Sequence, residues 1–136
     1  MKGTVWILDR NEENLAVLLD ALGRAGVPAL PFVTPESLLF HAQARHGHAV
    51  ERPRAAIVDA RTATGSEYAI REAIGSRLIV LTTWPPQIRP WLTVGVSRFL
   101  FKPYTTRALR DQLDPAAGVI ATAPLRRCAA AQDPAA

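Results

Sequence analysis

The stretch Arg54-Ala55-Ala56-Ile57-Val58-Asp59-Ala60 decides the expected fold, because a short apolar run within it ends at a single carboxylate. The run from Ala55 to Val58 is typical of a strand that is buried on both faces in a parallel sheet. A carboxylate is costly to bury unless the strand end opens into a polar crevice. In open α/β sheets, ligands bind in a crevice at the carboxyl ends of the strands. The stretch therefore predicts a parallel strand that ends at a polar site.

Strand-like runs alternate with helical segments along the rest of the chain. The other expected strands are Thr4 to Leu8, Pro28 to Val33, Leu78 to Leu81 and Arg98 to Phe101. Helices are expected after the capping residues Asn11, Thr34 and Thr105, over Ser66 to Ile74, and in short or irregular form over Gln87 to Val94. This alternation predicts the α/β class, with a doubly wound five-stranded parallel sheet and helices on both faces. Pro28 and Pro31 lack N–H donors, so the second strand is expected at an edge.

Apolar spacing within the helices predicts which side chains face the sheet. They are Leu38, Leu39 and Ala42 in the second helix, and Tyr68, Ala69 and Ala73 in the third. Trp84 and Trp91 flank a proline-rich turn. Core packing is expected for both, and an exposed partner surface is the alternative.

Length and composition bound the class of protein. The 136 residues suit one domain, expected at residues 1–114, followed by an Ala- and Pro-rich tail or linker at 115–136. The net charge of +4 comes from scattered arginines, so no direct nucleic-acid contact is expected. The sequence contains no apolar run of about 18 residues, so no membrane-spanning helix is expected. One cysteine, Cys128, excludes an intramolecular disulfide, and a cytoplasmic protein is expected.

Four polar residues follow four of the expected strands and are therefore expected on one rim of the sheet: Asp9, Asp59, Thr82 and Lys102. A carboxylate at such a position can attack a phosphoryl group. A second acid nearby can help to hold Mg²⁺, which accepts one or two carboxylates together with water and phosphate oxygens. A lysine and a threonine hydroxyl can stabilise the phosphate oxygens. The set predicts phosphoryl-transfer chemistry.

In this order the residues resemble the CheY-like receiver domain of two-component response regulators, over roughly Thr4 to Leu113. The most specific match is Phe99-Leu100-Phe101-Lys102-Pro103-Tyr104-Thr105, followed by two leucines of the last helix. The resemblance implies the flavodoxin-like strand order 2-1-3-4-5 and a cis peptide at Lys102–Pro103. It also implies phosphorylation by a histidine kinase or phosphotransfer protein. The implied roles are phosphoryl acceptor for Asp59, Mg²⁺ ligands for Asp9, Asp59 and the Arg61 carbonyl, phosphate partner for Lys102, and switch residues for Thr82 (with Thr83 as an adjacent candidate) and Phe99.

Three features depart from the family pattern. Receivers usually carry two adjacent acids after the first strand, whereas this chain has Asp9-Arg10. We hypothesise that the Arg10 guanidinium lies near Asp59 and partly replaces the charge of the metal. The loop after Asp59 lacks the usual Pro-Gly and Asp-Gly turn, and the segment from Asp59 to Thr82 is shorter than usual.

Two functions follow from the resemblance. The first is a phosphorylation-driven receiver that changes a partner or homodimer surface within residues 87–113. The alternative, favoured by Asp9-Arg10, is a pseudo-receiver that binds proteins without phosphorylation. A nucleotide- or flavin-dependent enzyme of this fold is disfavoured, because the sequence lacks GxGxxG, Walker A and GxSxG motifs. We therefore do not expect an enzyme.

Overall fold

A computed structural model describes residues 3–44, 52–83 and 85–114 of the chain. The chain divides into two compact units, Met1–Pro103 and Tyr104–Ala136. The first unit carries the whole sheet and every predicted site residue, and the second carries one described helix. The expected boundary after residue 114 remains a prediction, because residues 115–136 lie outside the described part.

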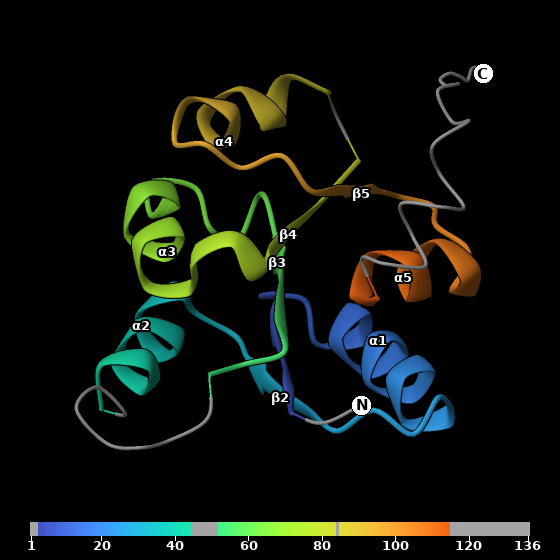
Figure 1. Ribbon diagram of the computed structural model, residues 1–136. Coiled ribbons are helices and arrows are strands. Elements are labelled where there is room, and N and C mark those ends of the chain that lie inside the picture. The colour runs from blue at the N-terminus through green and yellow to red at the C-terminus, as the bar shows by residue number, and fades with distance from the viewer. Residues whose placement is uncertain (1–2, 45–51, 84, 115–136) are drawn as a thin grey trace. The chain divides into compact units, whose positions relative to one another are not determined.

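The first unit is built on a five-stranded parallel sheet with the strand order β2-β1-β3-β4-β5 (Figure 1). Its strands are β1 (Val5–Leu8), β2 (Ala29–Phe32), β3 (Ala55–Asp59), β4 (Leu78–Thr82) and β5 (Phe99–Phe101). The predicted order is confirmed, and so is the edge position of the proline-containing β2. β3 and β4 extend one residue beyond the predicted apolar runs, so Asp59 and Thr82 are the last residues of their strands. β5 begins one residue later than predicted, at Phe99.

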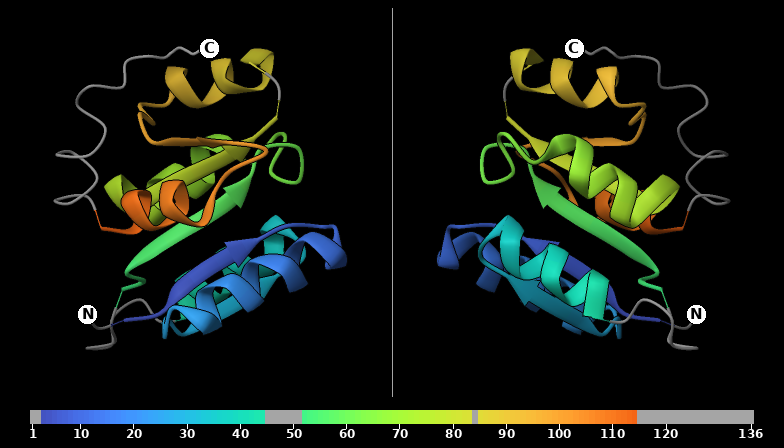
Figure 2. Two further views of the ribbon diagram at one scale, coloured as in Figure 1. Left: turned by 90° about the vertical axis from the view of Figure 1, so that its right-hand side faces the viewer. Right: turned by 90° about the vertical axis from the view of Figure 1, so that its left-hand side faces the viewer.

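Helices cover both faces of this sheet. The first unit contains α1 (Glu12–Arg24), α2 (Pro35–Ala44), α3 (Glu67–Ile74), the 3₁₀ turns η1 (Gly75–Arg77) and η2 (Pro85–Ile88), and α4 (Arg89–Thr93). α1 lies on one face, and α2 and α3 lie side by side on the other (Figures 1 and 2). Asn11 caps α1 as predicted, because its side-chain oxygen accepts a hydrogen bond from the Asn14 N–H at 2.9 Å. The predicted arrangement of helices on both faces is confirmed.

Alternating strand side chains supply the cores on the two faces. On the face of α2 and α3, buried residues of the strands pack with Leu38, Ile70 and Trp91. Leu39 and Ala42 of α2 pack against this cluster, as predicted. Trp91 is fully buried, so core packing is confirmed for it, while Trp84 lies outside the described residues.

The predicted inward face of α3 is wrong. Ile70 and Ile74 are buried, whereas Tyr68 is 67% exposed, and Ala69 and Ala73 are exposed as well. The two isoleucines are four residues apart and form one stripe, which removes more apolar surface from water than the alanine positions would.

The second unit contains α5 (Thr106–Leu113). The Thr105 side chain accepts a hydrogen bond from the Ala108 N–H at 3.0 Å and caps this helix, as predicted. Leu109 and Leu113 are four residues apart and therefore share one face of the helix. Within the described residues, no helix is both long enough and apolar enough to cross a membrane.

Candidate functional site

Strand register brings the predicted polar residues to one rim of the sheet. Leu8 pairs with Val58, so Asp9 and Asp59 follow in adjacent positions at the ends of β1 and β3. Thr82 ends β4, and its carbonyl accepts a hydrogen bond from the Lys102 N–H at 2.8 Å, which fixes the start of the chain after β5. The peptide bond between Lys102 and Pro103 is cis, as the resemblance implies. The carboxyl ends of four strands thus meet around Asp59.

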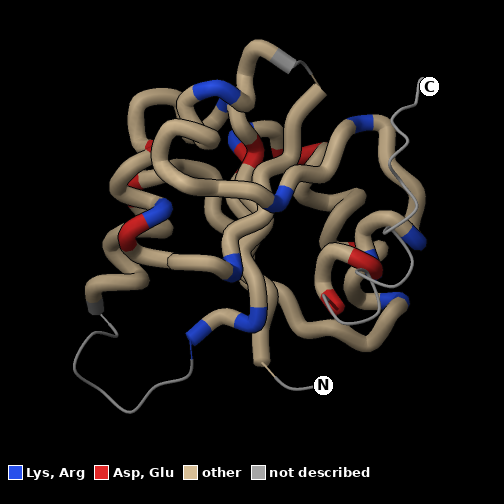
Figure 3. Tube along the Cα trace, turned by 45° about the horizontal axis from the view of Figure 1, so that its top comes forward, with Lys and Arg blue, Asp and Glu red and all other residues tan. Residues whose placement is uncertain are grey.

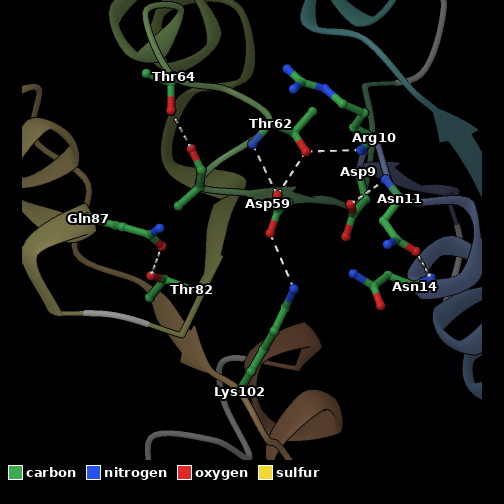
Figure 4. Close-up of polar contacts among 11 residues, drawn as sticks. Asp9, Arg10, Asn11, Asn14, Asp59, Thr62, Thr64, Thr82, Gln87 and Lys102 are labelled. Atoms are coloured by element: carbon green, nitrogen blue, oxygen red, sulfur yellow. Dashed lines mark hydrogen bonds and ion pairs between the residues drawn. The ribbon is translucent and has the colours of Figure 1, made fainter.

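Both oxygens of the Asp59 carboxylate have partners within the chain (Figure 4). The Lys102 ammonium lies 3.3 Å from Oδ1 and forms an ion pair with it. Oδ2 accepts two hydrogen bonds from Thr62, one from the backbone N–H at 3.0 Å and one from the hydroxyl at 2.8 Å. Asp59 is only 8% exposed, so these bonds supply the polar partners that a buried carboxylate needs.

Thr62 also connects Asp59 to the segment that follows β1. Its hydroxyl oxygen accepts a hydrogen bond from the Arg10 N–H at 2.9 Å while its proton is donated to Asp59. Thr62 is 4% exposed, so this bridge is shielded from water. The loops after β1 and β3 are therefore joined through a single side chain.

Asp9 is buried at 4% exposure and is held by the turn that follows it. Its Oδ1 accepts a hydrogen bond from the Asn11 N–H at 2.8 Å. Burial raises the pKa of Asp9 above its usual value of 3.8, and the nearby Asp59 carboxylate raises this pKa further. The Asn11 N–H, the Lys102 charge and the Asn14 side chain lower the pKa of Asp9 and oppose these effects only in part. Two carboxylates thus face one lysine.

The Thr82 hydroxyl is directed away from Asp59 (Figure 4). Thr82 is 1% exposed, and its Oγ1 donates a hydrogen bond to Gln87 Oε1 at 2.7 Å. Gln87 lies in η2, so this bond connects the end of β4 to the segment that precedes α4. Phe99, the other predicted switch residue, is half-buried in β5 with its ring 6.5 Å from that of Phe101.

The structure does not bring the Arg10 guanidinium to Asp59. The Arg10 side chain is exposed, and Figure 4 shows it extending away from both carboxylates. Its backbone N–H, rather than its charge, takes part in the site. A side chain at the start of an exposed loop keeps its charge in water, since desolvating a guanidinium beside the site would cost free energy.

The predicted metal ligands fit Mg²⁺ in part. Asp9 and Asp59 supply two carboxylates, the number that Mg²⁺ commonly takes from proteins. The Arg61 carbonyl accepts bonds from the Thr64 hydroxyl at 2.9 Å and the Thr64 N–H at 3.3 Å, which occupy both of its lone-pair sites. The carboxylate pair therefore fits the ion, whereas the carbonyl does not fit it in this conformation. Within the described residues, no cluster of three or more His, Cys, Asp or Glu side chains offers another metal site.

Thr62 and Gln87 are the polar partners that the sequence did not predict. Thr62 follows Asp59 by three residues, a spacing at which side chains often bond to a turn, and this signal could have identified it. Gln87 lies beyond a proline-rich break, and no sequence pattern connects it to Thr82. Figure 3 shows Lys and Arg scattered over several segments of the chain.

By sequence, the chain matches neither a protein-family model nor a curated protein. Its structure resembles the receiver domain of a sensor histidine kinase from Pseudomonas aeruginosa, described with a magnesium ion in its active-site cleft. The TM-score is 0.69 at 21% identity, over 87% of this chain and 99% of that one. The chemotaxis protein CheY4 of Vibrio cholerae gives a TM-score of 0.68 at 20% identity, over 85% of this chain and 98% of that one.

A response regulator from Burkholderia pseudomallei is also similar, with a TM-score of 0.69 at 18% identity, over 90% of this chain and 73% of that one. That structure carries a phosphorylated aspartic acid, a calcium ion and citrate. This chain has the fold of CheY-like receiver domains. At these identities, the likeness establishes the fold rather than the activity.

Proposed function

We propose that this chain, which has the receiver fold, receives a signal as a phosphoryl group on Asp59. The donor is a histidine kinase or a phosphotransfer protein. The observation that carries this proposal is the convergence on Asp59 of Lys102 at 3.3 Å and of the buried carboxylate Asp9. A carboxylate used only as a strand end would not need a lysine and a second buried acid beside it.

The reaction is a transfer between two nucleophiles. A carboxylate oxygen of Asp59 attacks the phosphorus of a phosphohistidine, an O–P bond forms, and the P–N bond breaks. The imidazole leaves with the bonding electron pair and takes up a proton. Lys102 is placed to stabilise charge on the transferred oxygens, because its ammonium already contacts Asp59.

A bound Mg²⁺ would supply positive charge that stabilises the phosphoryl oxygens. In this chain, Asp9 and Asp59 would hold it. Burial raises the pKa of Asp9 and the Asp59 carboxylate raises it further, so the charged form of Asp9 is disfavoured at this site, and a bound divalent cation would stabilise it. The magnesium ion of the Pseudomonas receiver and the phosphorylated aspartic acid of the Burkholderia regulator support this proposal, because both proteins have the same fold as this chain.

The output is a change in the equilibrium between two conformations of the chain. In the described conformation, Gln87 holds the Thr82 hydroxyl. A phosphoryl group on Asp59 would offer the Thr82 hydroxyl a charged acceptor. Rotation of this hydroxyl towards the phosphoryl group would break its bond to Gln87 in η2. The affected partner or homodimer surface lies within residues 87–113, where Leu92 and Phe101 are exposed apolar side chains.

The test is incubation of the purified chain with acetyl phosphate and MgCl₂, followed by intact-mass measurement. We expect the wild-type chain to gain one phosphoryl group and Asp59→Asn to gain none. Asp20→Asn, which changes an exposed carboxylate of α1, is the control and should be labelled like the wild type. Absence of labelling in the wild type under conditions that label another receiver would refute the proposal.

A second candidate is a pseudo-receiver that binds proteins without being phosphorylated. Two observations favour it: Thr62 already occupies Asp59 Oδ2, and Thr64 occupies the Arg61 carbonyl. These three bonds hold the loop after β3 in a closed turn. The same labelling experiment separates the candidates, because a pseudo-receiver stays unmodified while keeping its fold.

A further inference from the structure

One oxygen of Asp59 is occupied by a single neighbouring residue. A carboxylate oxygen offers about two lone-pair sites, and Thr62 fills both sites of Oδ2 with its N–H at 3.0 Å and its hydroxyl at 2.8 Å. Oδ1 accepts one bond, from Lys102 at 3.3 Å, and keeps the other site. The two oxygens of the same carboxylate are therefore unequal in the ligands that they can accept.

The proposed function, on which this inference rests, needs both oxygens. One must form the bond to phosphorus, and a site on the other is needed to ligate Mg²⁺. In the described geometry, Oδ1 can serve only one of these purposes. Because the Lys102 ammonium already lies on Oδ1, a second cation is repelled there and is directed to Oδ2. We infer that the Thr62 hydroxyl competes with Mg²⁺ for Asp59 and thereby sets the metal affinity of the site.

The position of the hydroxyl is fixed from its other side as well. Thr62 Oγ1 accepts the Arg10 N–H at 2.9 Å, so its single proton is directed to Asp59. At 4% exposure, Thr62 has little access to water that could replace this bond. Opening Oδ2 to a metal therefore requires breaking a buried, charge-assisted hydrogen bond. Thr62 acts as a positioning residue through Asp59, not as a catalytic residue.

The experiment measures Mg²⁺ binding directly, by calorimetric titration of the chain with MgCl₂ at constant ionic strength. Thr62→Val keeps the β-branched shape and the backbone N–H but removes the hydroxyl. It is expected to bind Mg²⁺ about tenfold more tightly than the wild type, since a hydrogen bond to a charged group no longer opposes the ion. Thr62→Ser keeps the hydroxyl and is expected to resemble the wild type.

A double variant tests whether the effect passes through Asp59. In an Asp59→Asn background, the further change Thr62→Val should give no gain in Mg²⁺ affinity, because the carboxylate that it uncovers is absent. An equal gain in that background would overturn the inference. So would an unchanged or weaker affinity in folded Thr62→Val, including the absence of binding to either form.

Thr62→Ala is the second variant in case valine does not fit the turn, and it carries the same expectation. Failure of both variants to fold would overturn the inference too, because the hydroxyl would then be a requirement of folding. The titration needs no phosphoryl donor. Loss of phosphorylation in every variant would therefore refute the proposed function while leaving the competition between Thr62 and Mg²⁺ measurable.

Discussion

The ends of β1 and β3 lie side by side in the sheet, yet the carboxylates that follow or end these strands, Asp9 and Asp59, have different partners. Asp59 has partners from two other segments: a lysine after β5 on one oxygen, and both donors of Thr62 on the other. Asp9 is also buried but is held by the turn that follows it, through the Asn11 N–H. Its pKa is raised chiefly by burial, and the charge of Asp59 raises it further.

Asp59 and Asp9 therefore differ in how well the chain compensates a negative charge on each carboxylate. Asp59 is fixed in place by groups that also restrict access to it. The buried carboxylate of Asp9 has fewer partners that stabilise its charge, and a bound cation would stabilise that charge. The two acids therefore have distinct expected roles, and substitutions at this rim should affect different measurements.

The largest effect is expected from removing the cation that serves Asp59. Lys102→Met should lower the rate of phosphoryl transfer from acetyl phosphate about 100-fold, because no fixed positive charge would meet the transferred oxygens. The rate is measured by intact mass over time at saturating MgCl₂. Lys102→Arg keeps the charge with a different geometry and should lose less. Equal rates in wild type and Lys102→Met would show that the ion pair with Asp59 is structural only.

Next in size is the loss of the second carboxylate. Asp9→Asn should weaken Mg²⁺ binding by about tenfold or more, roughly 1.4 kcal/mol, because only Asp59 would remain to hold the ion. The asparagine oxygen can still accept the Asn11 N–H, so the start of α1 is preserved. Calorimetric titration with MgCl₂ gives the affinity, and Asp20→Asn serves as the control. Unchanged affinity in Asp9→Asn would place the metal, if it binds, elsewhere.

The same substitution should have a smaller and opposite effect on stability without metal. The pKa of Asp9 is higher in the folded chain than its usual 3.8, so the folded state binds more protons than the unfolded state between these two values. The stability cost of the Asp9 charge is therefore fully present above the folded pKa and disappears as the pH falls below about 3.8.

Asp9→Asn removes this cost, so its Tm at pH 7 should exceed that of the wild type by a few degrees in metal-free buffer. The gain should vanish on acidification to below pH 3.8. Thermal unfolding followed by circular dichroism across this range provides the measurement. A lower Tm for Asp9→Asn at neutral pH would mean that the carboxylate makes stabilising contacts that outweigh its burial.

The sequence predicted the strand ends of this site better than the loops between them. Apolar runs that stop at a polar residue are a local signal, so Asp9, Asp59, Thr82 and Lys102 were predicted together at one rim. The direction of Arg10 depended on the competition between solvation and ion pairing, which no local pattern records. The bridge through Thr62 depended on the path of the turn after β3.

The inward face of α3 shows a different limit. Successive residues of a helix are rotated by about 100°, so an error of this size in the predicted orientation of the helix selects the wrong side chains as the buried ones. Ile70 and Ile74 have larger apolar side chains than the two alanines and lack the polar hydroxyl of Tyr68, and their spacing of four residues is visible in the sequence. Tyr68 and the two alanines lie beside the stripe of these two isoleucines and are exposed.

The smallest expected effect concerns Thr82 at the end of β4. Gln87 accepts a hydrogen bond from the Thr82 hydroxyl. Gln87→Leu removes the acceptor of the 2.7 Å bond and should cost about 1 kcal/mol or less in global stability. Because this bond connects β4 to η2, the loss should act locally and speed amide hydrogen exchange in Arg89–Thr93. Thr93→Val is the matched control, since it removes a side-chain bond to the Arg89 carbonyl within α4 itself. If Thr93→Val speeds exchange in this segment and Gln87→Leu does not, the Thr82–Gln87 bond does not hold the segment, and the proposed route from Asp59 to α4 would lose its first step.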